Sequence, residues 1–198
     1  MGNGDATFNP RVDYAVGVFP QNVITGDFNG DGKLDLAVLN YGSLYGHGSV
    51  SILLGNGDGT FEPHVDYTVG IAQRGLVAGD FNGDGKLDLA VASGNPYPNT
   101  SAVAAILIGN GNGSFQAAVP ITITGSTNIA YGITAADLNH DGKLDLALTD
   151  NTSNVYVLLG NGNGSFASPL TYSVSGGPAA IAAANLDGDG NIDLAWNW

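Results

Sequence analysis

A ten-residue segment, DFNGDGKLDL, occurs twice in this sequence without a change, at residues 27–36 and 80–89. Two close variants follow, DLNHDGKLDL at residues 137–146 and NLDGDGNIDL at residues 185–194. These four acidic segments recur at intervals of about 50 residues, a period typical of stacked repeats. One unit of such a repeat cannot bury its own faces and must pack against its neighbours. The sequence therefore predicts a chain of similar structural units.

A second motif, the Gly/Asn turn, recurs with the same period. Its copies share a GNG core and end on Phe, at residues 2–8, 53–61, 107–115 and 158–166. We expect a hairpin turn, because Gly and Asn adopt the positive φ that tight turns require. The alternative is a calcium-binding nonapeptide of a parallel β-roll. It is disfavoured because the copies do not recur every nine residues, and Asp58 is replaced by Asn112 and Asn163.

The residues between these motifs have the pattern of strands. In the second repeat KLDLAVAS alternates in polarity, while SAVAAILIG and FQAAVPITIT are short apolar runs bounded by Gly, Asn and Pro. Such runs predict strands, and no helical periodicity is sustained. Each repeat is thus expected to form four antiparallel strands, A to D. The acidic segment joins A to B, and the Gly/Asn turn joins C to D.

The predicted fold is all-β, a β-propeller of four-stranded antiparallel blades, with about 3.75 blades in one repeat domain spanning residues 1–198. Its expected parts are a lone N-terminal strand D at 6–17, blade 1 at 21–70, blade 2 at 74–124, blade 3 at 130–175 and a partial blade 4 at 178–198. Strand C would be missing if the two ends shared a blade. We therefore expect either a fragment of a longer propeller or a propeller completed by a second chain.

Oxygen-bearing side chains occupy positions 1, 3, 5 and 9 of each acidic segment, and Gly occupies position 6. Short side chains at positions 1, 3 and 5 converge when the loop curls around one point, and position 7 can add its backbone carbonyl. Oxygen ligands of this kind suit Ca²⁺. The predicted ligands are Asp27, Asn29, Asp31, Lys33 and Asp35; Asp80, Asn82, Asp84, Lys86 and Asp88; Asp137, Asn139, Asp141, Lys143 and Asp145; and Asn185, Asp187, Asp189, Asn191 and Asp193.

The alternative is a hairpin that needs no metal, since Asn-Gly and Asp-Gly turns are common. Three carboxylates within nine residues would repel one another in such a hairpin. In the fourth segment Asn185 and Asp187 exchange the residue types of positions 1 and 3, so that three carboxylates are kept. We therefore expect about four Ca²⁺ ions, one in each A–B loop. Their role would be mainly structural, because they would offset much of the net charge of −13.

The sequence resembles the FG-GAP/VCBS repeat family, the β-propeller repeat of integrin α subunits and of many bacterial secreted proteins. The resemblance rests on AGDFNGDGKLDLAVAS at residues 78–93 and its three relatives, which with their flanking strands cover essentially the whole chain. It implies about seven blades in a complete fold, with Ca²⁺ loops on one rim. The integrin-type Gly-Ala-Pro after strand B is absent, and LAVASGNP and LAVLNYGS stand there instead. The resemblance is therefore closer to the bacterial branch.

Composition restricts the partners of this chain. A net charge of −13 argues against nucleic acid and against anionic membranes. No apolar run is long enough to span a bilayer, so we expect no membrane insertion. The sequence contains no cysteine, and its first residues do not resemble a secretory signal peptide. Ca²⁺ loops nevertheless favour an extracellular or cell-surface location, where Ca²⁺ is abundant.

No catalytic arrangement is evident in the sequence. His47, His64 and His140 share no repeat position and lie beside no paired acid or nucleophile. Closely spaced acids occur only inside the predicted metal loops, so we expect no enzyme activity.

The B–C loops are rich in Tyr, Asn and Gly, and loops of this kind often bind ligands. Tyr41, Tyr45 and Tyr97 could stack on sugars there, although tyrosines that pack a loop are the commoner case.

The expected function is a non-catalytic, calcium-stabilised extracellular module for adhesion or for carbohydrate or protein recognition. One alternative is a self-assembling structural protein, either a propeller completed by a second copy or a filament. Another is a non-catalytic propeller fragment of a secreted polysaccharide-active enzyme. The sequence contains no residues that would identify a substrate.

Overall fold

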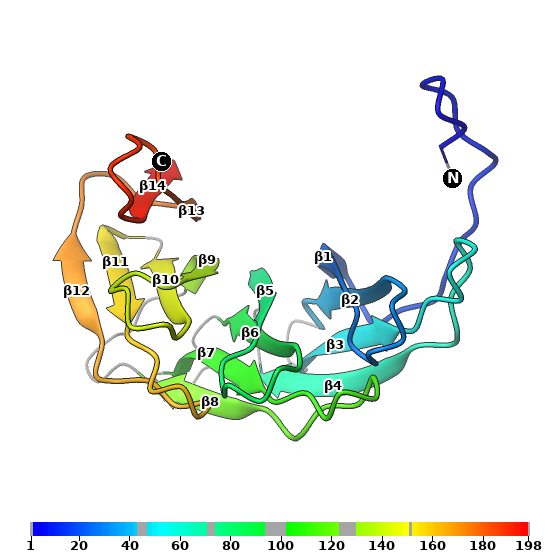
Figure 1. Ribbon diagram of the computed structural model, residues 1–198, viewed down its shortest axis with the longest axis horizontal. Helices are drawn as coiled ribbons and strands as arrows, with labels where there is room; N and C mark the ends of the chain where they lie inside the picture. The colour runs from blue at the N-terminus through cyan, green and yellow to red at the C-terminus, as the bar shows by residue number, and fades with distance from the viewer. Residues whose placement is uncertain are drawn as a thin grey trace.

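The computed structural model describes residues 2–42, 47–70, 74–93, 102–122, 130–150 and 152–197. Within these ranges all regular secondary structure is β-strand, arranged as three four-stranded sheets and one two-stranded sheet (Figure 1). The predicted all-β class and the four-stranded antiparallel blades are confirmed. None of the described residues forms a helix capable of spanning a bilayer.

Each blade is built from consecutive strands that pair antiparallel in chain order. Blade 1 contains β1 (Pro20–Gly26), β2 (Asp35–Asn40), β3 (Gly48–Leu53) and β4 (Val65–Gly70). Blade 2 contains β5 (Gly75–Gly79), β6 (Asp88–Ala92), β7 (Ala102–Leu107) and β8 (Val119–Thr122). Blade 3 contains β9 (Ala130–Ala136), β10 (Asp145–Asp150), β11 (Asn154–Leu158) and β12 (Leu170–Ser173). The half blade contains β13 (Ala180–Ala184) and β14 (Asp193–Asn197).

The blades stand side by side along an open arc (Figure 1). The first strand of each blade lies on the inner side of the arc, where β1 contacts β5, β5 contacts β9 and β9 contacts β13. The fourth strands β4, β8 and β12 lie on the outer side and are mostly exposed. The second strands β6 and β10 are buried along their whole length. A buried strand needs apolar residues on both faces, which explains the near-continuous apolar runs after each acidic segment.

The hydrophobic core lies between neighbouring blades. One cluster joins Phe28 and Leu39 of blade 1 to Leu89 and Phe115 of blade 2. A second cluster joins Phe81 and Ile106 of blade 2 to Leu146, Leu148 and other residues of blade 3. Each blade therefore buries its faces against its neighbours, as the repeat pattern predicts.

Residues 6–17, for which the sequence predicts a lone strand D, include no strand in the structure. Only the second half of this segment contacts blade 1, where the Tyr14 ring meets Phe61 edge-on with 5.3 Å between ring centroids. The Gly17 N–H donates to Ser51 Oγ at 3.1 Å. A strand D forms its ladder with strand C of its own blade, and no strand of the described part of the chain pairs with this segment.

Candidate metal centre

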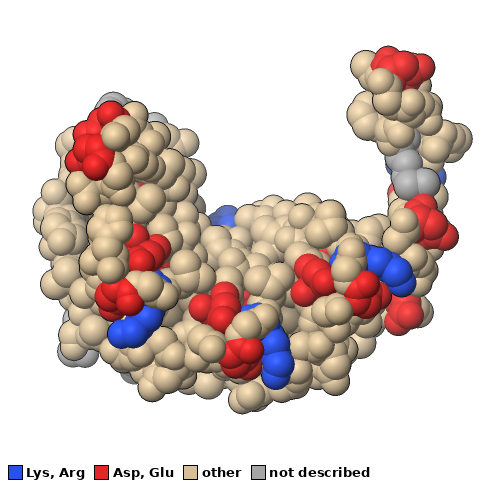
Figure 2. Space-filling view, viewed as in Figure 1, with Lys and Arg blue, Asp and Glu red and all other residues tan. Residues whose placement is uncertain are grey.

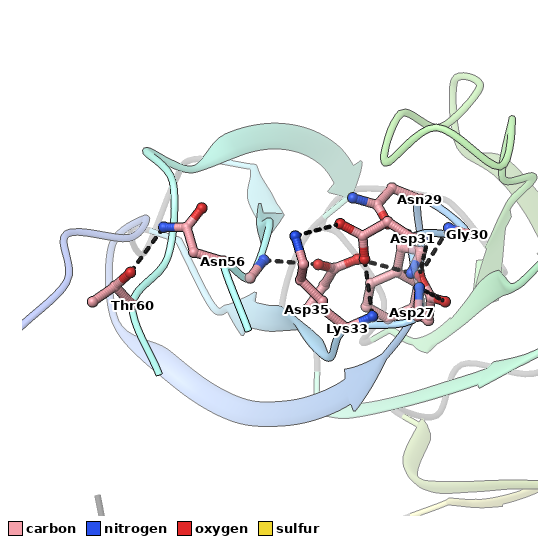
Figure 3. A network of polar contacts seen from close by, with 11 residues as sticks. Asp27, Asn29, Gly30, Asp31, Lys33, Asp35, Asn56 and Thr60 are labelled. Atoms are coloured by element: carbon pink, nitrogen blue, oxygen red, sulfur yellow. Dashed lines mark hydrogen bonds and ion pairs between the residues drawn. The ribbon is translucent and has the colours of Figure 1, made fainter. Parts of the chain in front are cut away.

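The loop between β1 and β2 is wrapped around the side chain of Asp27 (Figure 3). One carboxylate oxygen of Asp27 accepts the N–H groups of Gly30 at 2.8 Å and Asp31 at 3.1 Å, and the other accepts the N–H of Gly32 at 2.8 Å. Gly30 and Gly32 have φ angles of 75° and 80°. This left-handed backbone suits Gly and allows the sharp curl.

The same wrapping recurs in the next two loops, around Asp80 and Asp137. In the fourth loop the Asn185 side chain accepts the N–H of Gly188 at 2.7 Å. His140 occupies the loop position of a glycine and adopts a φ of 61°, which is strained for a residue with a Cβ. Its Nε2 lies 3.2 Å from Asn191 Oδ1 of the fourth loop, so adjacent loops contact each other.

The side chains at positions 3 and 5 also accept N–H groups from their own loop. Asn29 Oδ1 accepts the N–H of Asp31 at 3.0 Å, and Asp31 Oδ1 accepts the N–H of Lys33 at 2.9 Å. That bond from the Lys33 backbone, aided by the Lys33 ammonium 3.3 Å from Asp31, lowers the pKa of Asp31. In all four loops the side-chain oxygens at positions 1, 3 and 5 thus accept N–H groups of their own loop.

A lysine accompanies the acids in three of the four loops. Lys33, Lys86 and Lys143 form ion pairs with the position-5 aspartate of their own loop. Figure 2 shows the resulting acidic patches along the arc, with the blue lysines beside them. In the fourth loop Asn191 replaces the lysine and donates to Asp189 Oδ2 at 2.7 Å. Local charge is therefore only partly balanced, because each loop has three carboxylates.

The position-9 aspartates have a structural role that the sequence reasoning missed. Asp35 is fully buried, and its oxygens accept the N–H of Phe28 in the A–B loop and of Gly55 in the C–D turn, both at 2.8 Å. Asp88 and Asp145 make the same pair of bonds in blades 2 and 3. We call each of these side chains the clasp aspartate, because it ties the two loops of its blade together.

The donor types in these loops fit Ca²⁺. They are carboxylate and amide oxygens with a backbone carbonyl available at position 7, and each carboxylate oxygen can accept more than one bond. No group of three or more His, Cys, Asp or Glu side chains in the described ranges is arranged to hold a metal ion. The three aspartates of each acidic segment therefore do not form such a group by themselves. The predicted set also includes an Asn side chain and a main-chain carbonyl.

The predicted ligand surface can be followed at Tyr41, because Tyr45 and Tyr97 lie outside the described residues. The Arg74 guanidinium lies between the rings of Tyr41 and Tyr131, 5.1 Å from each centroid. Arg74 Nε is buried without a hydrogen-bond partner, and no ion pair of Arg74 occurs among the described residues. Sequence reasoning missed Arg74 and Tyr131, because neither belongs to a repeated motif.

A cavity of about 400 Å³ opens beside this cluster. It is lined by Phe19, Gln21, Tyr41, Gly42 and Arg74. The cavity thus combines aromatic surface with one cationic group, which suits a ligand with an apolar face and a negative charge.

Comparison with solved structures shows similarity to β-propellers. The crystal structure of BBS1N in complex with ARL6DN, soaked with lead, matches with a TM-score of 0.54 and 15% identity over 90% of this chain. The match covers 52% of that chain, so the present sequence spans about half its length. A chain of the Photorhabdus luminescens Tc holotoxin pore matches at a TM-score of 0.44 and 16% identity, over 91% of this chain and 11% of that one.

Comparison of sequences gives the family. No curated protein matches this sequence. A family model described as an FG-GAP-like repeat matches residues 27–91, 80–148 and 144–196, each match containing at least one acidic segment. These matches cover most of the sequence and confirm the resemblance inferred from the repeats. The chain belongs to the FG-GAP-like repeat family and has its blades arranged as in a β-propeller.

Proposed function

We propose that this chain is a calcium-binding, non-catalytic recognition module that works outside the cell. The observation that carries the proposal is the repeated A–B loop, in which the side-chain oxygens at positions 1, 3 and 5 accept N–H groups of their own loop in blade 1 and again in blades 2 and 3. An ion in the first loop would be held by Asp27, Asn29 and Asp31, with the Lys33 carbonyl and Asp35 closing the set. The equivalent residues would hold one ion in each other loop.

Calcium would supply the positive charge that these loops lack. Each loop has three carboxylates but at most one lysine. Backbone hydrogen bonds lower the pKa of Asp31 and of Asp189, and both carboxylates are ionised at neutral pH. Ionised carboxylates suit a cation site, whereas a general acid needs a raised pKa. The lowered pKa of Asp31 and of Asp189 therefore favours cation binding over general acid catalysis at these two positions.

An extracellular location is part of the same proposal. FG-GAP-like repeats are typical of extracellular or surface proteins. Exposed loops of this kind bind Ca²⁺ more weakly than cytosolic buffers do, and millimolar Ca²⁺ outside the cell would fill them.

The cavity beside Arg74 is the surface that we assign to recognition. The Arg74 guanidinium lies between two tyrosine rings and has no ion pair among the described residues, an arrangement that suits a carboxylate-bearing sugar or an acidic peptide side chain. This assignment retains Tyr41 of the predicted ligand residues. Acidic and neutral oligosaccharides can be compared by calorimetry, and we expect only the acidic ones to bind. Arg74→Met should abolish that binding and leave the folded state intact.

Calcium binding is tested by titration calorimetry of metal-stripped protein and by thermal unfolding with and without a chelator. We expect about four ions to bind and the Tm to fall by more than about 10 °C on chelation. The triple change Asp31→Asn, Asp84→Asn and Asp141→Asn should remove most of the binding heat. Asp58→Asn, in an exposed Gly/Asn turn, is the matched control. Absence of binding heat together with a Tm insensitive to chelator would refute the proposal.

A further inference from the structure

The Phe that ends the Gly/Asn turn of blade 2 or blade 3 packs against the preceding blade. Phe115 of blade 2 meets Phe28 and Tyr67 of blade 1, with ring centroids 5.8 Å and 5.5 Å away, and is only 7% exposed. Phe166 of blade 3 meets Phe81 of blade 2 at 6.0 Å. The same contact therefore joins blade 1 to blade 2 and blade 2 to blade 3.

Two backbone hydrogen bonds accompany this contact. The fifth residue of the turn donates its N–H to the preceding blade, from Gly113 to the Phe28 carbonyl and from Gly164 to the Phe81 carbonyl, both at 2.9 Å. The first glycine of the turn donates to the clasp aspartate of its own blade. The turns of blades 2 and 3 are thus each defined by a Phe packed on the preceding blade and by bonds from their first and fifth residues.

A groove lies between blade 3 and the half blade. It is lined by the residues on which another Gly/Asn turn would pack. The groove has a volume of about 510 Å³, and Leu138 and Tyr172 stand in it at the positions of Phe28 and Tyr67. Tyr172 is 53% exposed and Trp196 on its far wall is 37% exposed.

Asp193, which stands in the half blade at the sequence position of the clasp aspartates, also lines this groove. One of its oxygens accepts the Leu186 N–H at 2.9 Å. The bond that a turn glycine makes to the other oxygen in blades 1 to 3 has no counterpart here within the described ranges.

Residues 2–17 carry a turn with no such groove around it. Their sequence repeats residues 55–70 with changes only at Ala6, Asn9, Arg11 and Ala15. The turn is already formed, since Gly2 bridges Phe8 as Gly55 bridges Phe61, and the Asn3 N–H donates to the Thr7 carbonyl at 3.0 Å. Phe8 is 78% exposed. One chain therefore has both a preformed turn with an exposed Phe and a groove that no described residue fills.

We propose that residues 2–8 of one copy dock in the groove between blade 3 and the half blade of a second copy. Phe8 then packs on Leu138 and Tyr172 of the second copy, the Ala6 N–H donates to its Leu138 carbonyl and the Gly2 N–H donates to the second oxygen of its Asp193. All three contacts are equivalent to contacts of the turns in blades 2 and 3. A single docked orientation of residues 2–8 can therefore make them at the same time.

The resulting assembly is head to tail. The N-terminal segment and the half blade lie at opposite ends of the arc (Figure 1), so the segment of one copy reaches the groove of another. A contact between two different surfaces makes a ring or an open chain of copies rather than a symmetric pair. No third strand pairs with β14 among the described residues, so we expect weaker association than between internal blades.

Ala6 offers a specific test of the geometry. Its φ is 68°, a conformation that favours glycine, and glycine stands at this turn position in the three internal copies. A Cβ on Gly113 would lie 2.7 Å from the Leu54 side chain, and one on Gly164 would lie 2.9 Å from Ile108. The Cβ of a docked Ala6 would meet the equivalent Leu159 of the second copy. Ala6→Gly should therefore strengthen the association.

The experiment is sedimentation velocity over a concentration series in Ca²⁺-containing buffer. Wild type should associate with increasing concentration. Phe8→Asp and Tyr172→Asp should each associate at least ~10-fold more weakly. An equimolar mixture of the two should form dimers and stop there, because one variant retains the groove and the other retains the turn. Val65→Asp, at an exposed apolar residue of β4, is the control and should behave as wild type.

Far-UV circular dichroism and the Tm of each variant establish that it is folded. A monomeric wild type at all concentrations overturns the proposal. The absence of a dimer in a mixture of the two folded variants also overturns it. So does self-association that is unchanged in both Phe8→Asp and Tyr172→Asp. Ala6→Gly should shift association to lower concentration, and a decrease would contradict the docking geometry.

Discussion

At the scale of single residues, aspartates at different positions of the repeat have different structural roles. Asp88 is fully buried and accepts two backbone N–H groups, and its burial raises the pKa of its carboxyl. Asp58 is exposed, and its bonds from the Thr60 hydroxyl and N–H lower its pKa. A buried acceptor with two donors cannot be replaced without leaving one donor unpaired. Substitution of a clasp aspartate should therefore lower the free energy of unfolding more than substitution of any other acid.

Replacing a clasp aspartate should destabilise the fold even without calcium. In Asp88→Asn one oxygen is replaced by an NH₂ group that faces a backbone N–H, so we expect a loss of about 2 kcal/mol in the free energy of unfolding. Urea unfolding in the presence of chelator measures it apart from any metal effect. Asp58→Asn should be close to neutral at pH 7, because Asn112 and Asn163 make the same turn bonds. An equal decrease in the free energy of unfolding of the two variants would contradict the proposed role of the clasp aspartate.

At the scale of elements, stability comes from contacts between blades. A propeller blade has two faces, and the buried strands β6 and β10 can be covered only by neighbours. The turn phenylalanines are the side chains that join the outer part of one blade to the next. Equivalent turn phenylalanines should therefore contribute differently to the free energy of unfolding, depending on whether a neighbouring blade packs against the ring.

The pair Phe115→Ala and Phe8→Ala tests this directly. Phe115→Ala removes a buried ring between blades 1 and 2 and should cost about 3–5 kcal/mol. Phe8→Ala should cost less than about 0.5 kcal/mol in the dilute monomer, because Phe8 is 78% exposed. Chemical denaturation at low protein concentration compares them. Comparable losses would mean that Phe8 is packed within the monomer.

At the scale of the whole molecule, both the net negative charge and the open arrangement of the blades affect the stability of the fold. The net charge is −13, and the acids are concentrated along the arc (Figure 2). Repulsion among neighbouring loops opposes the compact form, and salt screens this repulsion. The half blade at one end and the N-terminal segment at the other have fewer neighbours than blades 1 to 3 (Figure 1).

Salt should substitute for calcium in part. In chelator, raising NaCl from about 20 mM to about 500 mM should raise the Tm, because the Debye length falls from more than 20 Å to less than 5 Å. In excess Ca²⁺ the same change should have a much smaller effect, because the loops are already neutralised. Differential scanning calorimetry makes both measurements. Equal salt effects in the two buffers would show that charge repulsion in the loops is not what calcium relieves.

The sequence alone determined the repeat, the blades and the loop geometry. These features depend on neighbouring residues, such as Gly30 and Gly32, whose positive φ lets the loop fold around Asp27. Only the tertiary structure decided how residues far apart in the sequence meet. It assigned Asp35 to Phe28 and Gly55, placed Arg74 between Tyr41 and Tyr131, and left residues 6–17 without a strand. A local pattern specifies a backbone conformation, whereas burial and pairing depend on which neighbour the fold provides.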